Sequence, residues 1–89
     1  IQPQSRQAFA RLLEQGWTDA LRTLYPNGPL WTFWDYERGR WLADKGMRLD
    51  HLLLSPTLKN KLVDGGVDRW VRGEPNASDH APAWIVLDV

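Results

Sequence analysis

The sequence predicts an α/β layer in which a mostly antiparallel sheet is covered by two helices. Apolar residues recur at helical spacing after Ser5 and again after Ser55. Between and after these stretches lie short segments rich in tryptophan, leucine, isoleucine and valine, which are typical of strands. Several apolar strands with only two covering helices leave one sheet face without a partner. The chain is therefore expected to form one layer of a larger assembly.

Helical segments are predicted at residues 5–16, 17–24 and 55–66. In the last of these, Ser55 is the expected cap and Pro56 the first helical residue. Paired glycines end that segment, as they commonly end helices.

Strands are predicted at residues 31–36, 47–55, 67–72 and 83–89. The element order is then helix, strand, strand, helix, strand, strand, with the second short helical turn belonging to the first helical region. No internal repeat interrupts this single small domain of 89 residues.

Composition and charge narrow the classes of function. Eleven basic and eleven acidic residues cancel, so any contact with nucleic acid must come from a local patch. The absence of cysteine excludes a disulfide framework and a thiolate metal site. No apolar run approaches the roughly 18 residues of a membrane span. Six tryptophans form an unusually large aromatic load, suited to core packing or to stacking on a ligand.

Asp79 and His80 stand directly before the final predicted strand, and Asp50 lies within the apolar segment "RLDHLLL". Strand ends are places where a rigid scaffold presents functional groups. A buried aspartate is costly without a partner, and a histidine is a natural one. These residues therefore form a candidate Asp–His pair, with Asp79 as a carboxylate suited to a hard divalent cation.

The same residues also admit a structural interpretation. "SDH" before Pro82 is compatible with a turn that enters a strand, and Asp50 could pair with Arg48 or Arg69. A serine-based triad is disfavoured because the strained turn that exposes such a serine is absent, and two histidines do not make a zinc site.

The segments "WTFWDY", "GMRLDHLLLSP" and "SDHAPAW" together resemble the C-terminal part of the exonuclease III family. This family comprises abasic-site endonucleases and 3′-exonucleases within the endonuclease/exonuclease/phosphatase superfamily. The resemblance extends over residues 1–89 and includes the leading "RQAFARLLEQGWTDALRTLYP". It implies the C-terminal half of a four-layer, DNase I-like α/β sandwich.

The resemblance also implies roles for the candidate residues. His80 would contact the scissile phosphate or help activate the attacking water, and Asp50 would hold and polarise it. Asp79 would serve a Mg²⁺ (or Mn²⁺) site, whose charge stabilises a phosphoryl-transfer transition state. The implied reaction is hydrolysis of double-stranded DNA at abasic sites or 3′ ends, and the implied location is the bacterial cytoplasm.

Phe33, Met47 and Leu49 match the positions that line the family's small apolar pocket for a base-free deoxyribose. From the residues alone, all three could equally be plain core. Arg48 is the candidate phosphate contact beside them, together with Arg40 and Lys45. Two departures from the family pattern are Met47, where leucine or an aromatic residue is familiar, and Glu37, where a basic residue often follows "W-D-Y".

Several parts of the family's site have no counterpart in these residues: the metal-binding glutamate, an asparagine near the N-terminus, the active-site tyrosine and the "G-D-x-N" motif. The 89-residue chain alone is therefore expected to be inactive and, with an apolar face uncovered, to self-associate. Two other functions remain open. One is a superfamily phosphodiesterase with a non-DNA substrate, and the other is a tryptophan-rich module that binds nucleic acid or protein.

Overall fold

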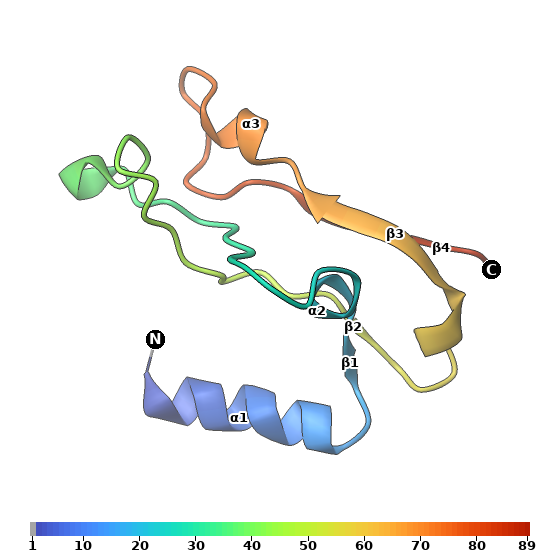
Figure 1. Cartoon of the computed structure of the whole chain (residues 1–89). Helices are drawn as coiled ribbons and strands as arrows, with labels where there is room; N and C mark the ends of the chain where they lie inside the picture. Colours follow the sequence, from blue (N-terminus) through green and yellow to red (C-terminus); the bar gives the residue numbers. More distant parts are fainter. Residues whose placement is uncertain (1) are drawn as a thin grey trace.

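The computed structural model describes residues 2–89, apart from the side chain of Arg38. Residues 2–89 form three short α-helices, two single-turn 3₁₀ helices and two small antiparallel sheets (Figure 1). The elements in order are α1 (Pro3–Glu14), β1 (Thr18–Asp19), α2 (Ala20–Leu24), η1 (Glu37–Gly39), β2 (Leu53–Leu54), η2 (Lys59–Lys61), β3 (Leu62–Val67), α3 (Arg69–Arg72) and β4 (Ala83–Leu87).

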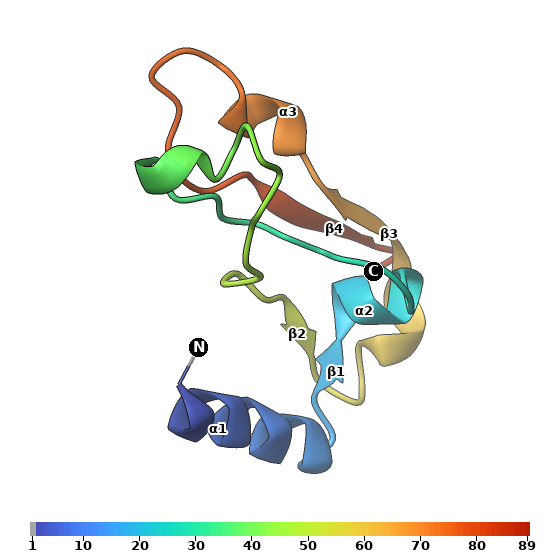
Figure 2. The same ribbon diagram turned by 60° about the vertical axis from the view of Figure 1, so that its left-hand side comes forward.

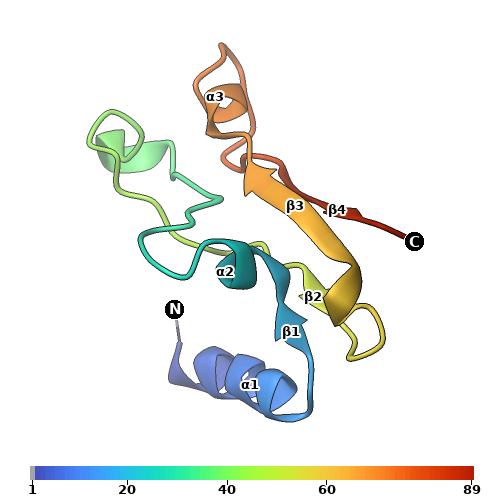
Figure 3. The ribbon, with the colours of Figure 1, turned by 45° about the vertical axis from the view of Figure 1, so that its right-hand side comes forward.

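The two sheets have two strands each. β1 pairs with β2, with Thr18 opposite Leu54, and β3 pairs with β4 over five registered positions. The β3–β4 ribbon and α1 lie on opposite sides of the molecule, as Figures 2 and 3 show. The predicted α/β character and antiparallel pairing are confirmed, but the pairing is divided between two sheets instead of running through one.

The extended segment around Phe33 connects the parts of the chain that carry the candidate residues. Phe33 forms antiparallel bridges with Met47 on one side and His80 on the other. The amide of Phe33 donates to the carbonyl of Met47 at 3.1 Å, and that of Trp34 donates to the carbonyl of Asp79 at 2.9 Å. Residues 31–36 and 47–55, predicted as continuous strands, are thus interrupted: the first stretch pairs only at these bridges, and β2 is the only strand within the second.

The core is small. Its fully buried apolar members are Ala20, Leu21, Trp34, Leu54 and Ala81. Helix α1 contributes no buried residue to it. Within residues 2–89, no helix is both long and apolar enough to cross a membrane.

The predicted helix at 55–66 is wrong. After a turn and η2, the chain enters β3, which runs through Gly65 and Gly66 instead of ending there. Gly65 has no room for a side chain, because a Cβ there would lie 2.9 Å from the carbonyl oxygen of Trp84 in β4. Close approach of two backbones is a common reason for glycine within a strand.

The predicted strand at 67–72 is also wrong, because residues Arg69–Arg72 form the single turn α3. This turn brings Arg72 into the interior, where its guanidinium donates to the carbonyl of Trp34. At the N-terminus, α1 begins at Pro3 rather than Ser5. Proline fits the first turn because its missing N–H would have no partner there.

Candidate active site

Thr32 organises the centre of the candidate site. It is completely buried, and its hydroxyl accepts hydrogen bonds from the amides of Leu49 at 3.1 Å and Asp50 at 3.0 Å. Its carbonyl accepts from the amide of Ala81 at 2.8 Å. Thr32 therefore ties the segment that carries Asp50 to the segment that follows His80. Nothing in the sequence indicated this role, because Thr32 lies in a predicted strand, where threonine is common.

Asp50 and His80 are in contact although they are 30 positions apart in the chain. Nδ1 of His80 lies 2.6 Å from Oδ2 of Asp50, and both side chains are a little under half exposed. A carboxylate at this distance holds the proton on Nδ1 and leaves Nε2 as the nitrogen available to a substrate. The alternative salt bridges are not formed: Arg48 pairs with Asp19 and Arg69 with Asp44.

The electrostatics favour an ionised Asp50. Partial burial works against its charged form, but hydrogen bonds from the His80 ring and the Thr32 hydroxyl outweigh this and lower the pKa of Asp50. The carboxylate is therefore charged at neutral pH and is suited to orient an imidazole.

The backbone before His80 is held by a local turn. The Ser78 hydroxyl accepts the amide of His80 at 3.1 Å, so "SDH" forms a side-chain-supported turn as well as presenting the histidine. The ring of Phe33 meets the His80 ring edge to face, with the centroids 5.1 Å apart. The half-buried Asp79 precedes them, and its carbonyl is bonded to Trp34.

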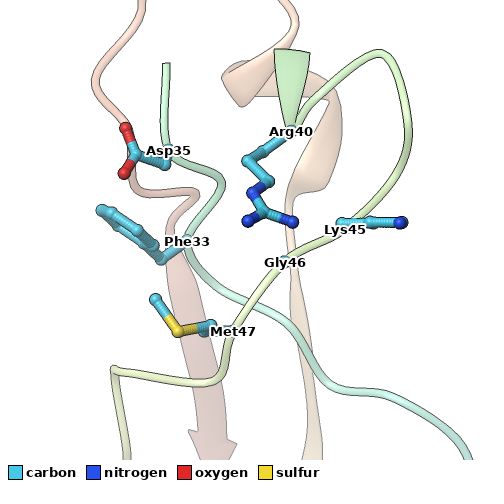
Figure 4. A pocket seen from close by; sticks show the side chains of 6 residues that line it. All are labelled: Phe33, Asp35, Arg40, Lys45, Gly46 and Met47. Carbon is cyan, nitrogen blue, oxygen red and sulfur yellow. The ribbon is translucent and has the colours of Figure 1, made fainter. Parts of the chain in front are cut away.

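A cavity of about 270 Å³ lies beside Phe33. Its lining residues are Phe33, Asp35, Arg40, Lys45, Gly46 and Met47. Figure 4 shows the Phe33 ring next to the Met47 thioether, with the Arg40 guanidinium reaching toward Gly46 between Phe33 and Lys45. Phe33 and Met47 therefore share one cavity, as the resemblance implies, and it also carries two cationic side chains.

Leu49 and Arg48 lie elsewhere. Leu49 lines the open depression of about 490 Å³ that contains Asp50 and His80. Arg48 forms its 2.6 Å salt bridge with Asp19, and its side chain is mostly buried. The structure thus does not bring Leu49 or Arg48 into the cavity with Phe33 and Met47. Arg48 points away from Met47 because adjacent residues of an extended segment face opposite sides, whereas Leu49 faces the depression that contains Asp50 and His80.

Among the described residues, no group of three or more histidine, aspartate or glutamate side chains is arranged to hold a metal ion. Mg²⁺ in proteins is usually bound by one or two carboxylates together with waters and substrate phosphates. Asp79 supplies one carboxylate of this kind.

The tryptophans are divided between interior and surface. Trp34 is buried and meets Trp41 edge to face at 5.2 Å, while Trp17, Trp70 and Trp84 are exposed. The idea of a tryptophan-rich binding module loses the support of Trp34 and keeps that of the three exposed rings.

Comparison with known proteins gives a consistent assignment. No family model matches the chain. It is 38% identical over 98% of its length to DNA repair nuclease APEX1 of Danio rerio, and 34% identical over 92% to exodeoxyribonuclease III of Haemophilus influenzae. Two solved structures superimpose closely: a Neisseria 3′ phosphatase bound to a product DNA hairpin (38% identity, TM-score 0.92) and an AP endonuclease of Archaeoglobus fulgidus (36%, 0.89). They cover 98% and 99% of this chain respectively. The chain is thus similar, over nearly its whole length, to one part of exonuclease III-type and AP endonuclease proteins.

The exonuclease III relatives are longer proteins. The chain spans 27% of the fish protein and 31% of the Haemophilus protein, and 34% and 35% of the two solved chains. These relatives come from a fish, bacteria and an archaeon, so a bacterial cytoplasmic location stays a prediction.

Proposed function

We propose that residues 1–89 supply the histidine–aspartate part of the active site of an exonuclease III-type nuclease. The whole protein would hydrolyse phosphodiester bonds of double-stranded DNA at abasic sites or 3′ ends. The 2.6 Å contact between His80 and Asp50 supports this proposal, because it brings together two candidate groups from motifs that are distant in the chain.

In this proposal Asp50 fixes the orientation and tautomer of His80. With Nδ1 bonded to the carboxylate, Nε2 contacts the scissile phosphate or exchanges a proton with the attacking water. Such a positioned acid or base contributes about 10²–10⁴-fold to a rate. Thr32 holds the backbone of Asp50, so the pair keeps its geometry before substrate arrives.

The cavity beside Phe33 is the proposed sugar-binding part of the site. Phe33 and Met47 offer an apolar surface, and the Phe33 ring also contacts the ring of His80. In the described part of the chain, neither Arg40 nor Lys45 belongs to a salt bridge, so both cations are available to phosphates. Arg48 is the weaker candidate for a phosphate contact because Asp19 already neutralises it.

A bound Mg²⁺ (or Mn²⁺) would neutralise charge that develops on the phosphate. Asp79 is the one ligand that we propose from these residues, and the other ligands would come from the rest of the family fold. The chain is accordingly proposed as the C-terminal half of the four-layer domain.

The test uses the full-length protein that contains this chain, with Mg²⁺, on an abasic-site duplex and on a duplex with recessed 3′ ends. His80→Ala and Asp50→Asn should each lower kcat by about 10²–10⁴-fold on the preferred substrate. Asp64→Asn is the matched control, since Asp64 is an exposed carboxylate on β3 that bonds only the neighbouring amide of Gly65.

Two outcomes would redirect the proposal. Wild-type activity in both variants would show that the pair is structural. Inactivity of the wild type on both DNA substrates, with His80-dependent cleavage of a small phosphodiester such as bis-p-nitrophenyl phosphate, would favour the non-DNA phosphodiesterase.

A further inference from the structure

Arg72, at the end of α3, is only 3% exposed although it carries a positive charge. Among the salt bridges of residues 2–89, none includes it. Its Nε and Nη2 both donate to the carbonyl of Trp34, at 3.0 and 2.7 Å, and its guanidinium lies 4.2 Å from the ring centroid of Tyr36. Burying a cation without a carboxylate is costly, so the two hydrogen bonds and the aromatic ring must compensate.

Both groups that Arg72 contacts are in turn connected to the segment before His80. The amide of Trp34 donates to the carbonyl of Asp79 at 2.9 Å. The hydroxyl of Tyr36 donates to the carbonyl of Ala77. Arg72 therefore stabilises, through Trp34 and Tyr36, two attachments of the 77–79 backbone.

This backbone decides where the His80 ring lies. The ring is nearly half exposed, and the Phe33 ring packs against one side of it. Its contact with Asp50 must then depend on the position of the chain at 77–80. A displacement of about 1 Å at a catalytic group can cost about 10²-fold in rate.

We propose that Arg72 is a positioning residue for the His80–Asp50 pair: it clamps the Trp34 carbonyl and the Tyr36 ring, which hold the Asp79–His80 backbone in register with Asp50. The inference rests on the proposed function for its kinetic readout. It also predicts a geometric effect on the pair that can be measured without catalysis.

The test is Arg72→Lys in the full-length protein, which keeps the charge but cannot direct two nitrogens at one carbonyl. Arg22→Lys is the matched control, because the Arg22 guanidinium also donates to backbone carbonyls, those of Tyr25 and Gly28, at an exposed position. We expect Arg72→Lys to lower kcat about 10- to 100-fold with KM within about two-fold, and Arg22→Lys to change neither. The pH profile of kcat should shift in Arg72→Lys only.

The second readout is the NMR signal of the His80 Nδ1 proton, assigned by its disappearance in His80→Gln. Weakening of the bond to Asp50 should move or broaden this signal in Arg72→Lys. If Arg72→Lys lowers only the melting temperature, while kcat, the pH profile and the Nδ1 signal stay as in the wild type, the proposal is overturned. If the His80→Ala enzyme is active, the proposed function is contradicted. The NMR signal would then still show whether Arg72 positions His80 against Asp50.

Tyr36→Phe keeps the proposal testable if Arg72→Lys does not fold. This change removes only the hydroxyl that bonds Ala77, and Tyr36 is 55% exposed. The same signal should shift in the same direction, by a smaller amount. An unchanged signal and kcat in Tyr36→Phe would again contradict the proposal.

Discussion

At the scale of single residues, the buried Thr32 hydroxyl has the largest structural influence on the candidate site. It accepts two amide hydrogen bonds from the segment that carries Asp50, and no other side-chain acceptor for these amides is found in the described chain. Valine has almost the same shape but cannot accept a hydrogen bond. Two part-buried amides would then lose their partner.

We predict that Thr32→Val in the full-length protein lowers the free energy of unfolding by about 1–3 kcal/mol and reduces kcat, because the backbone of Asp50 is released. Thr57→Val is the control, since the Thr57 hydroxyl meets only Ser55 at the surface. Chemical denaturation and steady-state kinetics are the measurements. Equal effects of the two substitutions would contradict the special role of Thr32.

His51 gives the stability of the chain a pH dependence near neutral pH. Burial first, and then the positive Arg48, lower the pKa of His51, while Asp19 and Asp50 act in the opposite direction. Because the folded state binds this proton less readily than the unfolded state does, the stability associated with neutral His51 is lost as the pH falls below its ordinary value of 6.5.

Asp19 and Asp50 contribute to the pH dependence of stability at more acidic pH. Burial opposes their charged forms, but hydrogen bonds from Arg48 and His80 respectively are among the causes that lower their pKa values in the fold. Their contribution is present above the ordinary value of 3.8 and is lost as the pH falls through the lower folded values.

We therefore predict that the urea midpoint decreases between pH 7.5 and 5.5, and that His51→Phe makes this decrease smaller. Phenylalanine keeps the aromatic contact with Phe9, whose ring centroid lies 4.5 Å from that of His51. Denaturation at several pH values measures the slope. An unchanged slope in His51→Phe would assign the dependence to other groups.

At the scale of elements, β3 forms where the local sequence pattern predicts a helix, because its residues pair with the neighbouring strand β4. Glycines that usually end a helix lie inside this strand because β4 passes too close for a side chain at Gly65. The hydroxyl of Tyr25 also donates to the Gly65 carbonyl at 2.7 Å, which joins the strand to the end of α2. Such contacts are invisible to a helix-stop rule, which considers only adjacent residues.

We predict that Gly65→Ala is more destabilising than Gly66→Ala, by about 1–3 kcal/mol. A Cβ at Gly65 would lie 2.9 Å from the backbone oxygen of Trp84, whereas a Cβ at Gly66 would meet a ring atom of Trp84 at 3.2 Å. A side chain yields more easily than a backbone. Comparison of urea midpoints tests the order, and the reverse order would contradict the register of β3 on β4.

At the scale of the whole molecule, the 89 residues form an open structure. The radius of gyration is 14.3 Å, against about 12 Å for a compact domain of this length. Val63 on β3 and Trp84 and Val86 on β4 are exposed. These features are expected of a layer that packs against another.

We predict that the isolated 89-residue chain self-associates through the apolar face of the β3–β4 ribbon and has no measurable nuclease activity. Val86→Lys should weaken the association, because a charge would replace an apolar contact there. Leu42→Lys is the control at a fully exposed loop position. Sedimentation at increasing concentration is the measurement, and a monodisperse wild-type monomer would contradict the prediction.

The sequence by itself determined the resemblance to exonuclease III-type nucleases, the chemical character of Asp50, Asp79 and His80, the first helix and the final strand. These follow from motifs and short-range periodicity, which depend on residues close together in the chain. Only the tertiary structure decided that Asp50 meets His80, that Thr32 and Arg72 support them, that Leu49 and Arg48 lie outside the cavity of Phe33 and Met47, and that β3 replaces a predicted helix. Each of these depends on contacts between distant segments, where burial and hydrogen bonding outweigh local propensity.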